Sequence, residues 1–250
     1  MNDLTFIFPL RIDSNERLEN IKTNINYLCN IFDNPNILVN EDGTNLLDDP
    51  RITKINSNLH YNFSRAKIVN NAVRNSNTEI IGIFDADVFF SKDDYEESYN
   101  RIKWNEYDFV FGYNGKFWNY RRDFINYLNC NRIEKGNEFL EYRLELMNHN
   151  EIGALSGSLF CTKEMFFKVG GQNENMISWG YEDNEFYERI LKLEKTLYRT
   201  SGIAYHIDHP RGIDSSWNNP YINKNQEEYY RIQKMNKQEL INEINSWLWK

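Results

Sequence analysis

The sequence predicts an α/β protein with a mixed, mostly parallel central sheet that helices flank in a single domain. The first observation behind this prediction is an apolar run, Ile80–Phe84, that ends in two aspartates, Asp85 and Asp87. A continuous apolar run is typical of a strand that is buried on both faces, as in a parallel sheet covered by helices. The second observation is the alternation of strand and helix patterns over the first half of the chain, which predicts βαβ units.

The elements of the first half follow one another in order. A strand is expected at Leu4–Leu10. Apolar residues then recur at helical spacing over Leu18–Phe32, and Ser14 is a suitable N-cap for that helix. A short strand is expected at Ile37–Val39, and a helix over Phe63–Asn75 leads into the apolar run that ends in the two aspartates.

The second half is expected to continue the same alternation of elements. The patterns predict strands at Asp108–Tyr113, Ser158–Cys161 and Thr196–Thr200, and helices at Asn137–Met147, Lys163–Gly170 and Asp183–Leu193. The remainder is expected to be a histidine-containing loop and a C-terminal amphipathic segment. The predicted boundaries are therefore a main domain over residues 1–215 and an extension over residues 216–250.

Composition limits the classes of function. The chain has 250 residues, of which 40% are hydrophobic and 26% charged, enough for a sizeable core without a sign of disorder. Its net charge of −8 argues against a nucleic-acid partner, because phosphate binding depends on clustered cations. Cys29, Cys130 and Cys161 are far apart, which argues against a disulfide framework or a thiolate zinc site. With no signal-peptide pattern and no long apolar window, the expected location is the cytoplasm.

Two groups of residues have the chemistry of a metal site. Asp85 and Asp87 follow the buried strand at the edge where such sheets bind ligands, and paired carboxylates suit a divalent cation and its diphosphate. His206 and His209 stand three apart after a predicted strand, and mixed carboxylate–imidazole shells suit manganese. The alternatives are a turn or helix cap for the aspartates and a solvated surface loop for the histidines.

A third group lies where acids begin a predicted helix. Glu182 and Asp183 could simply cap free N–H groups there, which is the structural alternative. The lead-in of Trp179, Gly180 and Tyr181 is less easily explained by capping. Aromatic rings offer an apolar face to a sugar, while carboxylates accept hydrogen bonds from its hydroxyls.

A fourth group combines aromatic and cationic residues. Phe63 and Arg65 begin a predicted helix, and Pro9 and Arg11 close the first strand. Arginine suits bidentate phosphate recognition, and a helix N-terminus adds free N–H donors. The alternative is an ordinary cationic helix face, which we favour for Lys67.

The ordered set of motifs resembles that of the GT-A fold glycosyltransferases. It is most similar to the β-1,4-galactosyltransferase family and to the family 2 type of bacterial glycosyltransferases that build capsule and lipopolysaccharide sugars. The motifs are Pro-x-Arg, Phe-x-Arg-Ala-Lys, Asp-x-Asp, Ser-Gly, Trp-Gly-x-Glu-Asp and His-x-x-His, all between Phe6 and Arg211. The resemblance implies a nucleotide-binding part over about residues 1–115 and an acceptor-binding part over about residues 116–215.

The resemblance also implies roles on the donor side of the site. Asp87, His206 and His209 would hold Mn²⁺ or another divalent cation, with His206 standing where the family has a methionine. Asp85 would contact the ribose or support the metal shell. Asp13 falls where the family often has a second arginine. The nucleotide would be lined by Pro9, Arg11, Phe63 and Arg65, with Phe63 against the uracil.

On the acceptor side, the resemblance makes Asp183 the general base and Glu182 the residue that orients sugar hydroxyls. Tyr181 replaces a glycine of the family motif, which should narrow the acceptor pocket. The donor and acceptor sugars would be held by Gly157, Trp179, Gly180, Tyr181 and Glu182.

The activity implied by the resemblance is metal-dependent, inverting hexosyl transfer from a UDP-sugar, with Gal or GalNAc as the sugar. The acceptor would be a hydroxyl of an oligosaccharide or lipid-linked glycan in bacterial surface polysaccharide synthesis. One alternative is a sugar-nucleotide pyrophosphorylase, which should carry a glycine-rich loop where this chain has Pro9–Asp13. Another is a catalytically silent subunit that binds nucleotide or glycan in a glycosyltransferase complex.

The C-terminal extension has an apolar face on a predicted helix. Its members are Leu240, Ile241, Ile244, Trp247 and Leu248. The favoured interpretation is a helix that packs over the core. The alternative is peripheral contact with the cytoplasmic face of a membrane or with a partner subunit, although glutamates balance the lysines of this segment.

Overall fold

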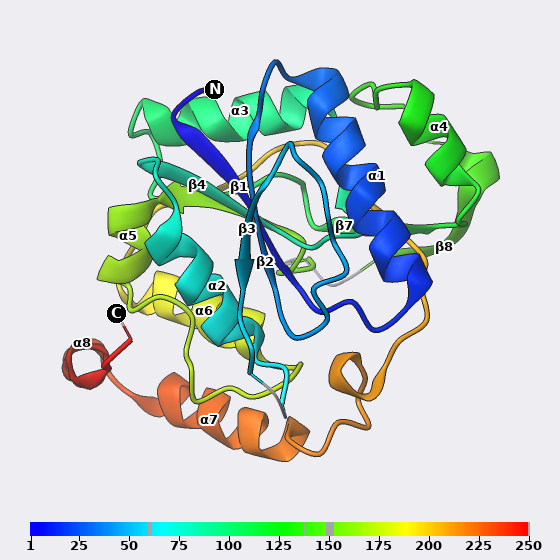
Figure 1. Cartoon of the computed structure of the whole chain (residues 1–250). Coiled ribbons are helices and arrows are strands. Elements are labelled where there is room, and N and C mark those ends of the chain that lie inside the picture. The colour runs from blue at the N-terminus through cyan, green and yellow to red at the C-terminus, as the bar shows by residue number, and fades with distance from the viewer. Residues whose placement is uncertain (60–61, 138, 149–152, 250) are drawn as a thin grey trace.

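The computed structural model, which describes residues 1–59, 62–137, 139–148 and 153–249, confirms the predicted fold class (Figure 1). The main sheet consists of β1 (Leu4–Leu10), β2 (Asn36–Glu41), β3 (Thr53–Asn56), β4 (Ile80–Phe84), β6 (Phe109–Phe111), β9 (Ser158–Thr162) and β10 (Leu197–Arg199). Their order across the sheet is β10-β6-β9-β4-β1-β2-β3. Only β9 runs antiparallel to its neighbours β4 and β6, so the sheet is mixed and mostly parallel.

The central strands are buried along their whole length, as their apolar sequences predict. Every residue of β1 and of β4 is buried, because helices cover the sheet around them (Figure 1). The helices of the main domain are α1 (Asn15–Ile31), α2 (Arg65–Asn75), α3 (Lys92–Lys103), α4 (Phe124–Cys130), α5 (Lys163–Lys168) and α6 (Glu182–Lys192). Ser14 caps α1 as expected, with its hydroxyl accepting a hydrogen bond from the backbone N–H of Arg17.

A second, smaller sheet lies outside what the sequence patterns predict. It contains β5 (Val88–Phe89), β7 (Lys116–Tyr120), β8 (Arg143–Asn148) and β11 (Ala204–Ile207), in the order β5-β11-β7-β8. His206, expected in a loop, therefore lies in a strand. The consequence for the site is that a sheet register, and not a free loop, fixes the position of this imidazole.

The helix predicted over Asn137–Met147 is wrong. Leu140–Tyr142 forms a single 3₁₀ turn, and Arg143–Asn148 forms β8, which pairs antiparallel with β7. Leu140 and Leu144, two of the apolar residues whose spacing suggested that helix, are 59% and 52% exposed. Pairing with β7 has overridden the helical spacing. Residue 138 of the predicted range lies outside the described residues.

The C-terminal segment forms α7 (Ile222–Lys234) and α8 (Lys237–Ser246), and the chain ends beside α5 (Figure 1). Of the predicted apolar face, Leu240, Ile244 and Trp247 are buried, whereas Leu248 is 99% exposed. The indole N–H of Trp249 donates to the carbonyl oxygen of Gly170 at 3.2 Å. The C-terminal helix therefore packs against the rest of the protein, as the favoured interpretation has it. This packing buries most of the apolar face that peripheral membrane contact would need. No helix in the described parts of the chain is long and apolar enough to cross a bilayer.

Candidate active site

The site begins at the carboxyl end of β4, where Asp85 and Asp87 follow the last buried residue of the strand. The short strand β5 comes next, and in it Val88 pairs antiparallel with His206 of β11. The backbone N–H of Ile207 donates to the carbonyl oxygen of Asp87 at 2.9 Å. Strand pairing thus brings the Asp-x-Asp and His-x-x-His motifs together, although about half the chain separates them.

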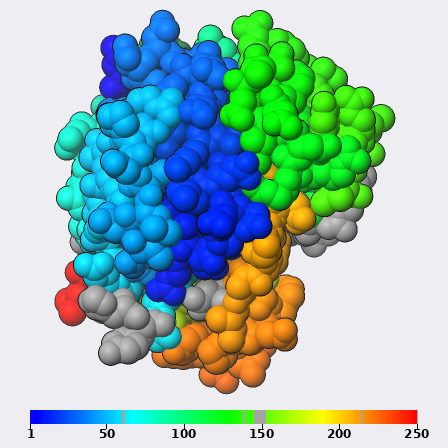
Figure 2. All heavy atoms as spheres, turned by 45° about the vertical axis from the view of Figure 1, so that its right-hand side comes forward, coloured from blue at the N-terminus to red at the C-terminus, as the bar shows by residue number. Residues whose placement is uncertain are grey.

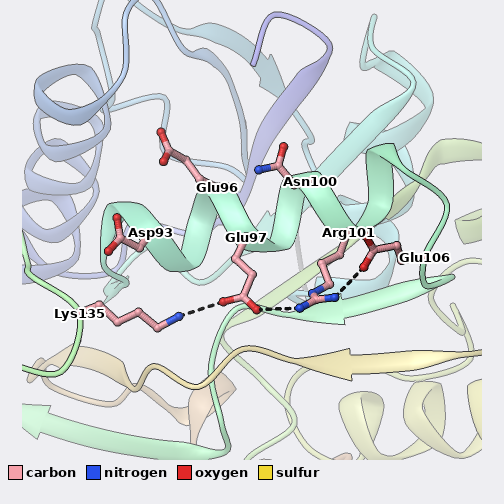
Figure 3. Close-up of a pocket in the computed structure, with 7 residues that line it drawn as sticks. All are labelled: Asp93, Glu96, Glu97, Asn100, Arg101, Glu106 and Lys135. Carbon is pink, nitrogen blue, oxygen red and sulfur yellow. Dashed lines mark hydrogen bonds and ion pairs between the residues drawn. The ribbon is translucent and has the colours of Figure 1, made fainter.

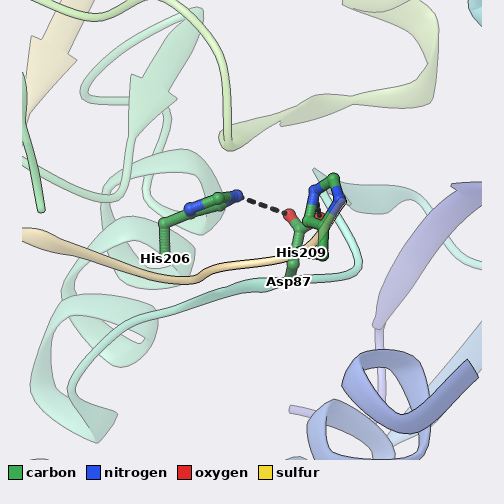
Figure 4. Close-up of side chains that lie close together, drawn as sticks. All are labelled: Asp87, His206 and His209. Carbon is green, nitrogen blue, oxygen red and sulfur yellow. Dashed lines mark ion pairs between the residues drawn. The ribbon is translucent and has the colours of Figure 1, made fainter. Parts of the chain in front are cut away.

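Asp87, His206 and His209 form one cluster (Figure 4). Nε2 of His209 lies 2.9 Å from Oδ2 of Asp87, and Nε2 of His206 lies 3.7 Å from Oδ1. One ligand atom from each residue falls within 4.8 Å of the others. Because one carboxylate and two imidazoles form a mixed oxygen–nitrogen set, the cluster fits a transition-metal ion such as Mn²⁺ better than Mg²⁺ or Ca²⁺.

The surroundings shift the pKa of each of the three side chains of the cluster. Burial opposes ionisation of Asp87, but the two imidazoles hold its pKa well below the ordinary value. Burial also lowers the pKa of His206, although the charge of Asp87 opposes this shift. For His209, burial lowers the pKa, but the hydrogen bond to Asp87 and the charge of that carboxylate together outweigh burial and raise the pKa. A bound cation would take the place of the proton that His209 shares with Asp87.

Asn119 fixes the orientation of His206. Its side-chain oxygen lies 2.7 Å from Nδ1 of His206, and β7 places the two residues in register with each other. Because an amide oxygen can only accept, Nδ1 carries a hydrogen, which leaves Nε2, the nitrogen nearer Asp87, as the atom that would bind a cation. Asn119 was not predicted, since nothing in its local sequence marks it as a neighbour of His206.

Arg65 connects the donor and acceptor sides of the site. It lies in the first turn of α2, with Nη2 2.9 Å from Oδ1 of Asp85 and Nη1 3.6 Å from Oδ1 of Asp183. The start of α2 is tied to the loop before α6, because the N–H of Ser178 donates to the carbonyl oxygen of Phe63 at 2.7 Å. The residues predicted to bind the nucleotide are thus connected directly to those predicted to bind the acceptor.

Glu182 and Asp183 lie in the first turn of α6, after a left-handed Tyr181 with φ of 69°. The N–H of Gly180 donates to Oε2 of Glu182 at 2.6 Å. Burial, reinforced by the neighbouring Asp183, raises the pKa of Glu182 to about 8. Burial also raises the pKa of Asp183 to about 6, while Arg65 opposes the shift. The pKa values of both carboxyls are therefore raised toward neutral pH, which suits proton transfer.

The raised pKa of Glu182 predicts that replacing it by glutamine stabilises the protein at pH 8. Between the unfolded pKa near 4.3 and the folded pKa of about 8, folding takes up a proton, so wild-type stability falls as pH rises. Glutamine does not ionise, so the Glu182→Gln variant does not lose stability in this way. Its melting temperature should be higher than that of wild type at pH 8 and close to it at pH 4. Each kcal/mol gained would shift the midpoint by about 2–4 °C.

Glu228→Gln is the matched control for this measurement. Ion pairing with Arg231 outweighs burial and lowers the pKa of Glu228, so this variant should lose stability at pH 8. Thermal melts followed by circular dichroism at both pH values give the comparison. Equal or lower stability of Glu182→Gln at pH 8 would contradict the shift assigned to Glu182.

The remaining predicted nucleotide residues lie near one another. The guanidinium of Arg11 lies 5.2 Å from the centre of the half-buried Phe63 ring. Nε of Arg11 donates a hydrogen bond to Oδ2 of Asp42 at 3.1 Å. Pro9 is buried within β1. Asp13, at the position where the resembled family often has a second arginine, is an acid and forms an ion pair with Nε of Arg17 at 2.9 Å.

Gly157 borders the same site. Its φ of +91° favours glycine, and an added Cβ would lie 3.1 Å from Phe117. Its carbonyl oxygen accepts a hydrogen bond from the N–H of Asp85 at 3.3 Å. Together with Arg65 and Asp183, Gly157 lines a narrow cavity of about 20 Å³.

A larger groove lies elsewhere, along α3 (Figure 3). Its volume is about 520 Å³, and none of the predicted site residues lines it. Two ion pairs lie within the groove: Lys135 with Glu97 at 2.9 Å, and Arg101 with Glu106 at 2.6 Å. We therefore place the site at the carboxyl end of β4.

Aromatic rings surround the Trp-Gly-Tyr-Glu-Asp segment. Trp179 meets Trp217 edge-on with ring centres 4.9 Å apart, and Tyr181 stacks on Tyr229 at 5.7 Å. Trp179 and Tyr181 were predicted at this site, whereas Trp217 and Tyr229 were not. The available signal was Trp217 itself, a lone tryptophan in the polar run Ser215–Asn219.

Two family models match this chain. The model described as glycosyl transferase family 2 matches residues 16–152, more than half of the chain. A second model, described as N-terminal domain of galactosyltransferase, matches residues 141–210, which include the acidic pair and both histidines. No curated protein matches the chain by sequence.

Among solved structures, the chain is similar to a mutant of Drosophila β-1,4-galactosyltransferase 7 in complex with manganese, UDP-Gal and xylobiose. The sequence identity is 15% and the TM-score is 0.50. The alignment covers 81% of this chain and 68% of that chain. At this level of identity the likeness establishes a shared fold.

Proposed function

The chain belongs to glycosyl transferase family 2, and from this premise we propose that it is a metal-dependent, inverting hexosyltransferase that uses a UDP-sugar. The observation that carries the proposal is the convergence of Asp87, His206 and His209 at the end of β4, beside Arg65 and Asp183. The proposed sugar is Gal or GalNAc, and the structurally similar galactosyltransferase contains UDP-Gal. The proposed acceptor is a hydroxyl of a glycan.

Mn²⁺ is the proposed cofactor, since the donor set suits it and the similar galactosyltransferase contains manganese. When bound, the cation supplies Lewis-acid chemistry that offsets negative charge on the departing diphosphate. Asp87, His206 and His209 would hold it. Asn119 and the carbonyl oxygen of Pro210 keep the two imidazoles oriented for that task.

The proposed reaction is a single displacement at the anomeric carbon of the donor. The acceptor oxygen forms the new bond as the bond from the anomeric carbon to the diphosphate oxygen breaks, and UDP leaves with the electron pair. Asp183 takes the proton of the attacking hydroxyl, and Glu182 orients the acceptor sugar. Attack from the face opposite the diphosphate inverts the anomeric configuration, so an α-linked donor gives a β-glycoside.

We further propose a cytoplasmic setting in bacterial surface polysaccharide synthesis. This part of the proposal rests on the resemblance of the ordered motifs to the bacterial members of the family. The acceptor in that setting would be an oligosaccharide or a lipid-linked glycan.

UDP release from UDP-Gal, UDP-GalNAc, UDP-Glc and UDP-GlcNAc tests the proposal. We expect saturable release from at least one donor with Mn²⁺, loss of release with EDTA, and recovery when excess Mn²⁺ is added back. No release from any donor would favour the silent subunit. Release that survives chelation would refute the metal requirement.

A further inference from the structure

Trp217 is an exposed aromatic residue on an otherwise ordered segment. Its side chain is 68% exposed, and it lies between the 3₁₀ turn Ile213–Ser215 and α7. The neighbouring Asn219 is 2% exposed and anchors the segment: its side-chain amide lies 2.5 Å from the carbonyl oxygen of Trp179. The backbone that carries Trp217 is therefore fixed while the ring faces solvent.

The ring stands beside the proposed acceptor residues. Trp217 meets Trp179 at 83° with ring centres 4.9 Å apart, and meets Tyr181 at 80° with centres 6.4 Å apart. Trp179 and Tyr181 lead directly into Glu182 and Asp183. Both contacts are edge-on and leave most of Trp217 uncovered, so the aromatic surface of Trp179 and Tyr181 continues onto this exposed ring.

The same segment also connects the two halves of the site. It follows His209, the last residue of the proposed metal cluster, and it reaches Trp179 on the acceptor side. Figure 2 shows this part of the chain, in orange, meeting the blue N-terminal residues and lying next to the green middle segment on one face. Trp217 is thus carried by the segment that joins His209 to α7, and its ring contacts Trp179 and Tyr181 on the acceptor side.

We propose that Trp217 forms an outer acceptor subsite that binds a second sugar ring, adjacent to the sugar that carries the attacking hydroxyl. The C–H face of a sugar would pack on the indole, and the exposed amide of Asn218 would meet its hydroxyls. The inference rests on the proposed function and adds a substrate class. The acceptor is then at least a disaccharide.

Matched pairs of acceptors test the subsite: methyl β-xyloside with xylobiose, methyl β-glucoside with cellobiose, and N-acetylglucosamine with chitobiose. Wild type should favour a disaccharide over its monosaccharide. Trp217→Ala should raise the KM for that disaccharide about tenfold and leave the KM for the UDP-sugar unchanged. Trp217→Phe should retain part of the preference. Trp104→Ala is the control, because Trp104 is 67% exposed and lies outside the site at the end of α3.

A binding measurement separates failure of the subsite from failure of the proposed function. Saturation-transfer NMR of the same disaccharides, with Mn²⁺ and UDP present, does not require turnover. A disaccharide signal that is lost in Trp217→Ala supports the subsite even if no UDP is released. Equal binding by wild type and Trp217→Ala, no preference for disaccharides, or no disaccharide binding by wild type would overturn the subsite. UDP release with Mn²⁺ would leave the proposed function intact.

Discussion

Asp87→Ala is expected to lower the Mn²⁺-dependent rate of UDP release by about 10³-fold at saturating UDP-sugar. Asp87 is the one carboxylate of the cluster, and both imidazoles face it. Without Asp87, the two imidazoles alone would bind the cation weakly. The negative charge on the departing diphosphate would then no longer be stabilised by the cation. A loss of about 4 kcal/mol of transition-state stabilisation corresponds to this factor.

Mn²⁺ titration followed by electron paramagnetic resonance gives the second readout, independent of turnover. Asp87→Ala should abolish tight Mn²⁺ binding. Asn119→Ala should weaken it by about 10–100-fold, because Asn119 only orients His206, and excess Mn²⁺ should restore most of its rate. Asp93→Ala, an exposed acid on α3, is the control and should match wild type in both measurements. Wild-type Mn²⁺ affinity in Asp87→Ala would remove this cluster as the metal site.

The central strands and helices were predictable because short stretches of sequence indicate which of their residues are buried. The apolar runs of β1 and β4 allow only buried strands, and Ser14 marks the start of α1. The second sheet had no such pattern. Its strands are short, and β8 exists because β7 offers it a partner, which overrides helical spacing around Leu144. Long-range pairing of this kind cannot be read from a window of sequence.

The site shows the same division between local and long-range information. Asp87, His206 and His209 were predicted together because the order of the motifs resembles that of a known family. Asn119 and Trp217 were missed, because each acquires its place only through strand or loop packing with a distant segment. Residues that touch the reacting groups leave motifs in the sequence, whereas residues that position or extend the site here do not.

Asp183→Asn is expected to lower kcat by about 10²–10⁴-fold while leaving the KM for the UDP-sugar nearly unchanged. An asparagine amide has nearly the same shape as the carboxyl but cannot take the proton of the attacking hydroxyl. The carboxyl lies 3.6 Å from Arg65, whose charge keeps it the more acidic member of the pair with Glu182. The acceptor-dependent rate should therefore fall, while Mn²⁺ binding, measured separately, should not change.

The pH profile of kcat/KM distinguishes a general base from a merely structural carboxylate. Burial raises the pKa of Asp183 to about 6, and the base must be deprotonated to act. The wild-type rate should thus be level above about pH 6 and fall tenfold per unit below it. Asp183→Asn should lose this acidic limb, whereas Asp183→Glu, which keeps a carboxylate, should retain it at a lower rate. An acidic limb that persists in Asp183→Asn and vanishes in Glu182→Gln would transfer the role of base to Glu182.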